Sequence, residues 1–252
     1  MNGGFYGNLN SEYSPMYSPK SLMKVTMNGQ LFLCMLAEQF EENGIHVDMA
    51  NTDGITILIK NDNIIRFNEI CKEWEKLSRT QLEEVEYSKV VRTNINNYLA
   101  FDLKGKPKEK GMFQNKPNIG NSTDNLIIPK AIKHYYVTGK SGVEFILNHQ
   151  DIYDFCASQR VDRNKYDVLH NGEYLPNKLN RYYASENGAY LYKQHKETKA
   201  LGHLLKDSGV TILNKKVENY SIKDFAINYT YYITEYNKLL AELNKKGQLS
   251  LF

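Results

Sequence analysis

The sequence contains few of the residues that mark secreted, metal-binding or membrane proteins. Its three cysteines, Cys34, Cys71 and Cys156, are far apart and in no spacing typical of metal ligands. An odd number of separated cysteines indicates free thiols in a reducing cytosol. No uncharged apolar stretch approaches the length that crosses a bilayer, and the N-terminus is rich in Gly and Asn rather than basic and then apolar. We therefore expect a cytoplasmic protein with no membrane partner.

The residues that are abundant indicate a globular protein with an uneven charge distribution. Apolar residues make up 41% of the chain, enough for a packed core, and 19 residues are tyrosine, whose ring suits both cores and wet binding surfaces. Residues 1–85 hold 7 basic against 12 acidic residues, whereas residues 86–252 hold 25 against 17. This asymmetry suits a protein that holds cations in one part and a polyanion in the other, and scatter between two solvated surfaces explains it equally well.

The spacing of apolar residues predicts helices and a hairpin in the first third of the chain. Helical spacing predicts a helix over 24–40 and a second one over 63–82. Between them, alternating runs at 45–50 and 55–60 predict a β-hairpin. The turn that joins its strands reads Asn51-Thr52-Asp53-Gly54.

The remainder of the chain completes an α+β fold, in which an antiparallel sheet with packed helices precedes a mostly helical domain. Two further strands are expected at 84–91 and 94–103, with a return strand opening at Met112-Phe113. A turn-rich segment at 115–125 is the expected domain boundary. Beyond it the pattern predicts four helices, near 128–137, 141–147 and 150–157 and from about 221 to 244.

The hairpin turn has two interpretations. Asn, Asp and Gly are favoured in any tight turn, because they accept positive φ at low cost. The order of motifs, however, resembles that of the family B DNA polymerases of bacteriophages. In that family a fingers motif ending in Tyr-Gly precedes a palm hairpin that carries Asp-Thr-Asp-Ser. The same layout is present here in FYGNLNSEYSPMYSPKSLMKVTMNGQLFLCMLAEQF (residues 5–40) followed by MANTDGITI (residues 49–57).

This resemblance implies a role for the acidic residue of the turn. Nucleotidyl transfer uses two divalent cations about 4 Å apart, and Mg²⁺ takes carboxylate oxygens as ligands. By resemblance, Asp53 is the catalytic metal ligand for Mg²⁺, and Tyr6 and Gly7 belong to the motif that binds the incoming dNTP.

Two departures from the family pattern matter. Asn51 replaces the first Asp of the motif and Gly54 replaces its Ser. The family's other metal-binding Asp, and the Lys that contacts the triphosphate, precede the Tyr-Gly motif with which this chain begins. We therefore expect a chain that is inactive alone. It is either one subunit, completed by an N-terminal polymerase chain, or a truncated form.

The resemblance continues into segments that contact primer–template DNA in the family. NINNYLAFDLKGKPKEKGMF (residues 94–113) resembles the segment that grips the DNA backbone at the palm–thumb junction. Tyr98 and Lys110-Gly111 match its motif, and Asn96-Asn97 replace its basic residues, which leaves phosphate charge to Arg92 or to loop lysines such as Lys108. Without the resemblance this is an exposed Lys-rich loop. The thumb-like region adds four expected DNA contacts, Lys130, Lys133, Arg181 and Tyr182.

The last five residues resemble the pentapeptide by which bacterial replication proteins bind the β sliding clamp. A free end can present apolar anchors to a pocket while a glutamine fixes their orientation. The expected clamp-binding residues are Gln248, Leu249, Leu251 and Phe252. The alternative is that this end packs back on the thumb.

Together these features divide the chain, by resemblance, into the end of the fingers motif with the palm helix (1–44), the palm with the catalytic hairpin (45–120), the thumb (121–246) and a clamp-binding tail (247–252). The leading interpretation is a palm-and-thumb portion of a DNA-directed DNA polymerase in the cytoplasm of a bacterial host cell. One alternative is a non-catalytic DNA-binding or clamp-associated module derived from a polymerase. Another is an unrelated nucleic-acid-binding protein in which the hairpin is only a turn.

Overall fold

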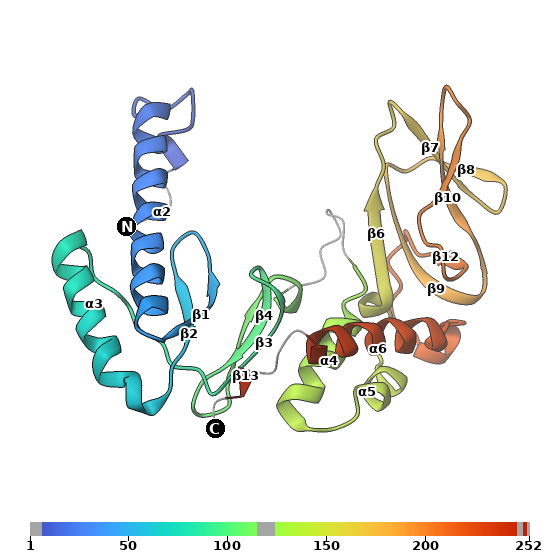
Figure 1. Cartoon of the computed structure of the whole chain (residues 1–252). Coiled ribbons are helices and arrows are strands. Elements are labelled where there is room, and N and C mark those ends of the chain that lie inside the picture. The colour runs from blue at the N-terminus through green and yellow to red at the C-terminus, as the bar shows by residue number, and fades with distance from the viewer. Residues whose placement is uncertain (1–6, 115–123, 246–248, 251–252) are drawn as a thin grey trace. The chain divides into compact units, whose positions relative to one another are not determined.

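The structure, a computed structural model, describes residues 7–114, 124–245 and 249–250 (Figure 1). It combines helices with antiparallel sheets, so the α+β class is confirmed. The chain divides into two compact units between Glu86 and Tyr87, whereas the expected boundaries at 44/45 and 120/121 stay predictions. All three cysteines are free. Among the residues described, none of the helices combines the length and the apolarity that a membrane crossing requires.

The first unit is a pair of helices around a β-hairpin. It contains α2 (Pro19–Glu42), β1 (His46–Ala50), β2 (Ile55–Leu58) and α3 (Ile64–Ser78) in that order. Helix α2 begins earlier than its apolar spacing predicts, because the Ser18 side chain caps it and Pro19 occupies the first turn. Helix α3 ends earlier than predicted, since Arg79 adopts a left-handed conformation with φ of 57°.

The core of the first unit lies between the helices and the hairpin. Its buried residues are Leu36, Phe40, Ile45, Ile70 and Trp74. The indole nitrogen of Trp74 donates a hydrogen bond to the backbone oxygen of Phe32 at 2.9 Å, which joins α3 to α2. The hairpin therefore packs on the two helices, with Val47, Ile55 and Ile57 partly buried against this core.

The second unit opens with a four-stranded antiparallel sheet of order β13-β3-β4-β5. Its strands are β3 (Lys89–Asn94), β4 (Asn97–Phe101), β5 (Pro107–Lys110) and the short β13 (Leu249–Ser250). The return strand thus comes earlier than predicted. Met112 lies instead in a 3₁₀ turn, Gly111–Phe113, because Gly111 takes a φ of 64° and ends the strand.

Three α-helices follow, and they pack on one another. They are α4 (Ile127–Thr138), α5 (Gly142–Asn148) and α6 (Tyr229–Lys245). Two of the predicted helices are shorter than expected. The segment 150–157 holds only a 3₁₀ turn, Ile152–Phe155, before a strand begins, and the segment 221–244 opens with a 3₁₀ turn, Ile222–Asp224, before α6.

Strands rather than helices fill the middle of this region, so a mostly helical thumb is not confirmed. A three-stranded sheet has the order β12-β9-β6, and a four-stranded sheet has the order β11-β10-β7-β8. The tyrosine-rich segments lie in these strands, which fits the preference of aromatic side chains for sheet positions. The strands are β6 (Cys156–Arg160), β7 (Tyr166–His170), β8 (Glu173–Leu175), β9 (Leu179–Ala189), β10 (Leu191–His195), β11 (Leu201–His203) and β12 (Val210–Ile212).

Tyr232 on α6 is the largest fully buried side chain of the second unit, with no exposed surface. Its hydroxyl donates to the backbone oxygen of Phe155 at 2.6 Å and accepts from the backbone nitrogen of Ala184 at 2.8 Å. Its ring also packs edge-on against Phe155. One side chain thus joins α6 to β9 and to the 3₁₀ turn before β6.

Replacing Tyr232 with Phe tests this connection. The variant keeps the ring but leaves a buried N–H and a buried C=O without their partner, which costs about 1–3 kcal/mol of unfolding free energy per unsatisfied group. Urea denaturation followed by circular dichroism measures the loss. Tyr174→Phe is the matched control, because the Tyr174 hydroxyl bonds Gln194 at the surface, and it should change stability by less than about 0.5 kcal/mol. Equal effects of the two variants would contradict the expectation.

Candidate functional site

The tip of the β1–β2 hairpin is a tight turn built by Asn51. The Asn51 side-chain oxygen accepts hydrogen bonds from the Asp53 backbone nitrogen and from the Thr52 hydroxyl, both at 3.1 Å. The Asn51 backbone nitrogen bonds the Gly54 oxygen at 2.9 Å and closes the turn. Because the amide of Asn51 satisfies the turn's backbone, the Asp53 carboxylate is left exposed at the tip.

Gly54 has no conformational need to be glycine. Its φ is not in the left-handed region, and a Cβ added to it would meet no atom within 4 Å. The backbone of the turn therefore accepts the serine found at this point in the family motif.

Asp53 supplies one carboxylate toward a metal site and no more. In the described part of the chain, no three His, Cys, Asp or Glu side chains gather closely enough to hold a metal ion. The other acid of the hairpin, Asp48, is half-buried within β1 rather than at the tip. Of the expected nucleotide contacts, Gly7 is exposed and Tyr6 lies outside the described residues. The residues present therefore do not make a complete Mg²⁺ site.

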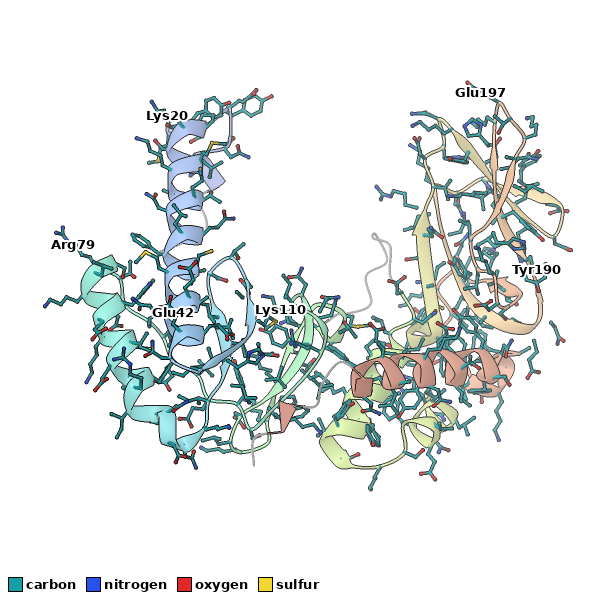
Figure 2. All side chains as sticks on the ribbon, in the orientation of Figure 1. Lys20, Glu42, Arg79, Lys110, Tyr190 and Glu197 are labelled. Atoms are coloured by element: carbon teal, nitrogen blue, oxygen red, sulfur yellow. The ribbon has the colours of Figure 1, made fainter. Side chains whose placement is uncertain are left out.

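The β3-β4-β5 sheet brings together four of the residues expected to contact DNA. Tyr98 on β4 pairs with Arg92 on β3 and with Lys110 on β5, so the three side chains form one row across the sheet. Lys108, two residues from Lys110, lies on the same face, and the Lys110 ammonium is 5.8 Å from the centre of the Tyr98 ring. Figure 2 labels Lys110 on this sheet. We refer to this set as the Tyr98 face.

The opposite face of the same sheet is packed in the core. Val91, Leu99 and Phe101 are buried there. Glu109 alternates with the two lysines and so lies on this core-facing side, where its carboxylate is 2.6 Å from the Lys133 ammonium. Alternation therefore sorts the charges of β5, with cations on the Tyr98 face and the acid on the other.

Gly111 lies at the end of this row, at a position that only glycine fits without strain. Its φ is 64°, and a Cβ there would lie 2.1 Å from the Asn96 backbone oxygen and 2.2 Å from the Asn97 side-chain oxygen. That Asn97 oxygen accepts a hydrogen bond from the Met112 backbone nitrogen at 2.8 Å. The glycine of the Lys-Gly motif is therefore explained by the close approach of the end of β5 to the β3–β4 turn.

The residues of the thumb-like region that were expected to contact DNA make contacts within the second unit instead. Lys130 is ion-paired with Asp154 and Lys133 with Glu109, so both cations are already matched by an acid. The Arg181 guanidinium donates to the backbone oxygens of Leu213 and Lys215 and lies over the Tyr153 ring. These three residues therefore join parts of the second unit.

The expectation for Tyr182 needs correction. Its side chain is only 5% exposed and belongs to a core cluster with Val168 and Leu191. Burial raises the pKa of its hydroxyl to about 12, with a further contribution from Asp124. A ring enclosed in the core cannot stack on DNA, so Tyr182 has a packing role.

The C-terminal tail is described only in part. Leu249 and Ser250 form β13, which pairs with Val90 and Lys89 at the edge of the sheet. Gln248, Leu251 and Phe252 lie outside the described residues. The clamp-binding role of the tail stays a prediction.

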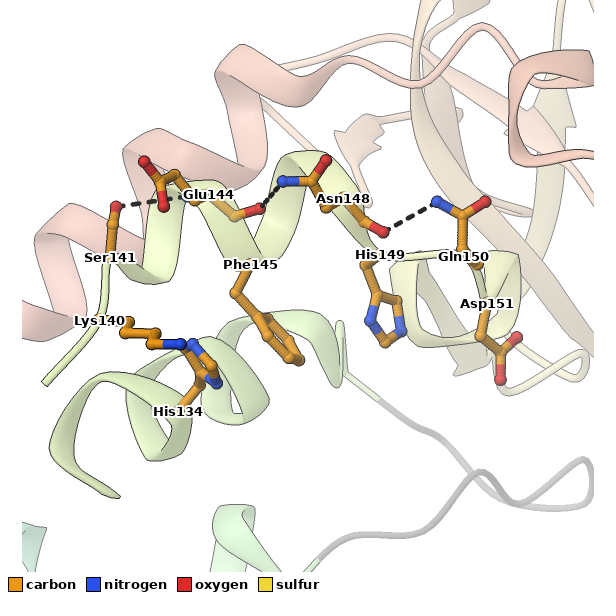
Figure 3. Close-up of a pocket in the computed structure, with 9 residues that line it drawn as sticks. All are labelled: His134, Lys140, Ser141, Glu144, Phe145, Asn148, His149, Gln150 and Asp151. Carbon is orange, nitrogen blue, oxygen red and sulfur yellow. Dashed lines mark hydrogen bonds between the residues drawn. The ribbon is translucent and has the colours of Figure 1, made fainter. Parts of the chain in front are cut away.

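A cavity of about 570 Å³ lies beside α4 and α5, and sequence reasoning did not find it (Figure 3). His134 and Phe145 stack in it with ring centroids 4.8 Å apart, and His149 lies 5.3 Å beyond Phe145. None of the site residues expected from the sequence lines this cavity.

The Nε2 atom of His149 is 2.6 Å from the Asp154 carboxylate, which is 1% exposed and also accepts from the Lys130 ammonium at 2.6 and 2.5 Å. Burial raises the pKa of Asp154, but hydrogen bonds from His149 and Lys130, together with the charges of both, outweigh it and lower the pKa below its ordinary value. No sequence signal joins these three residues, since up to 24 positions separate them.

Neither the models of known protein families nor the curated protein sequences contain a match to this chain.

Gly111→Ala tests whether the end of β5 requires glycine. The left-handed conformation costs an L-residue about 1–2 kcal/mol, and the overlap with the β3–β4 turn adds about 1–3 kcal/mol. Gly105→Ala is the control, since Gly105 has a φ of 77° but open space around its Cβ position, and it should show only the conformational cost. Urea denaturation of both variants measures the difference, and equal losses would contradict the role of the close contact.

Asp154→Asn tests the ion cluster through its pH dependence. A carboxyl whose pKa is lowered by folding stabilises the native state above its unfolded pKa of about 3.9. That contribution disappears as the pH falls through the lower pKa of the folded state. We expect Asp154→Asn to lose about 1.5–3 kcal/mol near neutral pH, since it removes hydrogen bonds to charged groups. The gap between variant and wild type should narrow below about pH 4, and a gap independent of pH would contradict this account.

Proposed function

We propose that this chain is the palm-and-thumb portion of a DNA-directed DNA polymerase of the phage family B type. Its role is to bind primer–template DNA and to contribute Asp53 to the metal site of nucleotidyl transfer. The observation that supports this most is the Tyr98 face. Arg92, Tyr98, Lys108 and Lys110, which the resemblance assigns to the DNA backbone, lie together on one face of the sheet and away from its core.

The chemistry of the Tyr98 face suits a nucleic-acid backbone. Three cations on one face release counterions when they neutralise phosphates, and a tyrosine among them packs against sugars. A polymerase must bind every sequence, so contacts to the backbone rather than to base edges are what this role requires. The strands hold the cations on a rigid support, which fixes their spacing without a loop that must be ordered on binding.

The hairpin supports the second half of the proposal. A carboxylate on a rigid tip can reach a reacting phosphate without movement of the strands that carry it. In a complete polymerase, bound Mg²⁺ stabilises the attacking and leaving oxygens. Asp53 would be one of its ligands, and further carboxylates must come from residues beyond those described. We therefore expect the chain to incorporate no nucleotide by itself.

A non-catalytic DNA-binding module is the second candidate. It is favoured by Asn51, which stands where the family has its first Asp and which serves the turn through hydrogen bonds rather than a charge. Under this alternative the chain still binds DNA. When an N-terminal polymerase chain is added, nucleotide incorporation does not depend on Asp53. Clamp binding by the tail fits both candidates, and it would require the Leu249–Ser250 strand to leave the edge of the sheet.

Binding of fluorescein-labelled primer–template DNA, measured by anisotropy over a range of salt, tests the proposal. Lys110→Gln should weaken binding to all sequences alike and reduce the salt slope by about 1, as removal of a phosphate contact does. Lys216→Gln is the matched control, because Lys216 is exposed and paired with Glu218, and it should leave the slope unchanged.

The same protein is tested in primer extension with Mg²⁺ and all four dNTPs. Absence of DNA binding, or equal effects of the two lysine variants, would contradict the proposed function. Strong nucleotide incorporation by the isolated chain would instead contradict its expected inactivity, and Asp53→Asn would then show whether the hairpin acid is required.

A further inference from the structure

The four-stranded sheet of order β11-β10-β7-β8 has one face in the core and one outside it. Val168 on β7 and Leu191 on β10 are buried and pack in one cluster with Val210. Because side chains alternate along a strand, Leu169 and Tyr192 point to the opposite face. We call this opposite face the outer face of the sheet.

Aromatic side chains form a row across this outer face. Tyr192 on β10 pairs with Leu169 on β7 and with His203 on β11, and Leu169 pairs in turn with Tyr174 on β8. The rings of Tyr192 and His203 are 4.5 Å apart between centroids, and Tyr190 extends the group 5.3 Å from His203. We call Tyr174, Tyr190, Tyr192 and His203 the aromatic row.

The rings of the aromatic row are accessible to a ligand. Tyr174 is 61% exposed and Tyr190 is 45% exposed. The hydroxyl of Tyr174 donates to the Gln194 side-chain oxygen at 2.9 Å, which holds the ring against the sheet. Large exposed rings on a regular sheet are costly to leave in water, so their concentration on one face indicates a binding surface.

Cations lie at the end of the same face. The Lys196 ammonium is 3.6 Å from the Asp167 carboxylate, and Asp167 lies on the outer face opposite Gln194. The backbone nitrogen of Lys196 bonds the oxygen of Lys165, so these two lysines are neighbours. Lys199 follows in the same turn, and all three are exposed. Figure 2 labels Tyr190 and Glu197, which lie on either side of β10 along the chain.

We propose that this face binds single-stranded nucleic acid, with bases stacked on the aromatic row and phosphates near Lys165 and Lys199. Every base has a flat face, so stacking on tyrosine and histidine accepts any sequence. A single strand can turn its bases toward the sheet, whereas a duplex keeps them inside its own stack. The combination of rings across the strands and lysines at one end matches the chemistry of a single strand better than that of a protein partner.

Binding of single strands at this face does not depend on the proposed polymerase role. The aromatic row and the Tyr98 face lie on different sheets and use different residues. Duplex binding is expected at the Tyr98 face and single-strand binding at the aromatic row. Either activity can therefore fail while the other remains.

The experiment measures anisotropy of a labelled dT oligonucleotide of about 12 nucleotides, within the site size of such surfaces. Tyr192→Ala should weaken binding about 10-fold, as loss of one stacked base does, whereas Tyr192→Phe keeps the ring and the affinity. Leu201→Ala is the matched control, since Leu201 is exposed and pairs with Gln194 on the same face but has no ring. It should change affinity less than about 2-fold.

Two further variants separate this surface from the duplex-binding one and guard against misfolding. Tyr98→Ala should weaken primer–template binding and spare the dT oligonucleotide. Tyr174→Ala removes the most exposed tyrosine ring of the row. It should weaken dT binding and leave the melting temperature at the wild-type value. Thermal melts of every variant show whether the fold is intact.

Several outcomes would overturn the inference. One is that the wild type fails to bind the dT oligonucleotide, and another is that Tyr192→Ala and Leu201→Ala lose the same amount of dT affinity. The third outcome is that, of all the variants, only Tyr98→Ala loses dT binding. A dimer in sedimentation analysis that Tyr192→Ala and Tyr174→Ala dissociate would also overturn it, because the row would then be an interface between two copies.

Discussion

The second unit depends on the buried hydroxyl of Tyr232. Helix α6, strand β9 and the turn before β6 come from parts of the chain that are far apart. The hydroxyl on α6 forms hydrogen bonds with the backbone of both β9 and that turn. The N–H of Ala184 lies where the pairing of β9 with β6 ends, and the C=O of Phe155 lies at the end of a 3₁₀ turn. Neither group has a partner of regular secondary structure there. A tyrosine satisfies the two together and fills the space with its ring, which no apolar residue could do.

Two sheets of the second unit expose different chemistry on their outer faces. The β3-β4-β5 sheet turns Val91 and Leu99 inward and Arg92, Tyr98 and Lys110 outward. The β7-β10 sheet turns Val168 and Leu191 inward and its ring-bearing residues outward. The cation-rich face suits a regular phosphate backbone, and the ring-rich face suits unpaired bases. A protein that handles a junction between duplex and single strand needs both kinds of surface.

The sequence predicts the local structure better than it predicts the sites. Apolar spacing located α2, α3, α4 and the β1–β2 hairpin, since each carries a clear period of its own. It failed for residues 156–212 of the thumb-like region, which form strands. Tyrosines there serve both helices and strands, and register decides between burial and exposure. Tyr182 and Tyr192 look alike in the sequence, yet one faces the core and the other the outer face. The Asp154 cluster could not be predicted, because its members meet only through tertiary packing.

The register of the β4–β5 hairpin means that the number of residues in β5 decides which charges the sheet exposes. Tyr98 faces Lys110 in the present register, and Gly111 holds the end of β5 by closing against the neighbouring turn. One inserted residue in β5 would exchange the faces, burying two lysines and turning Glu109 outward. Insertions and deletions here should therefore be tolerated in the turn at Lys104–Lys106 and purged from the strand, even where no individual side chain is altered.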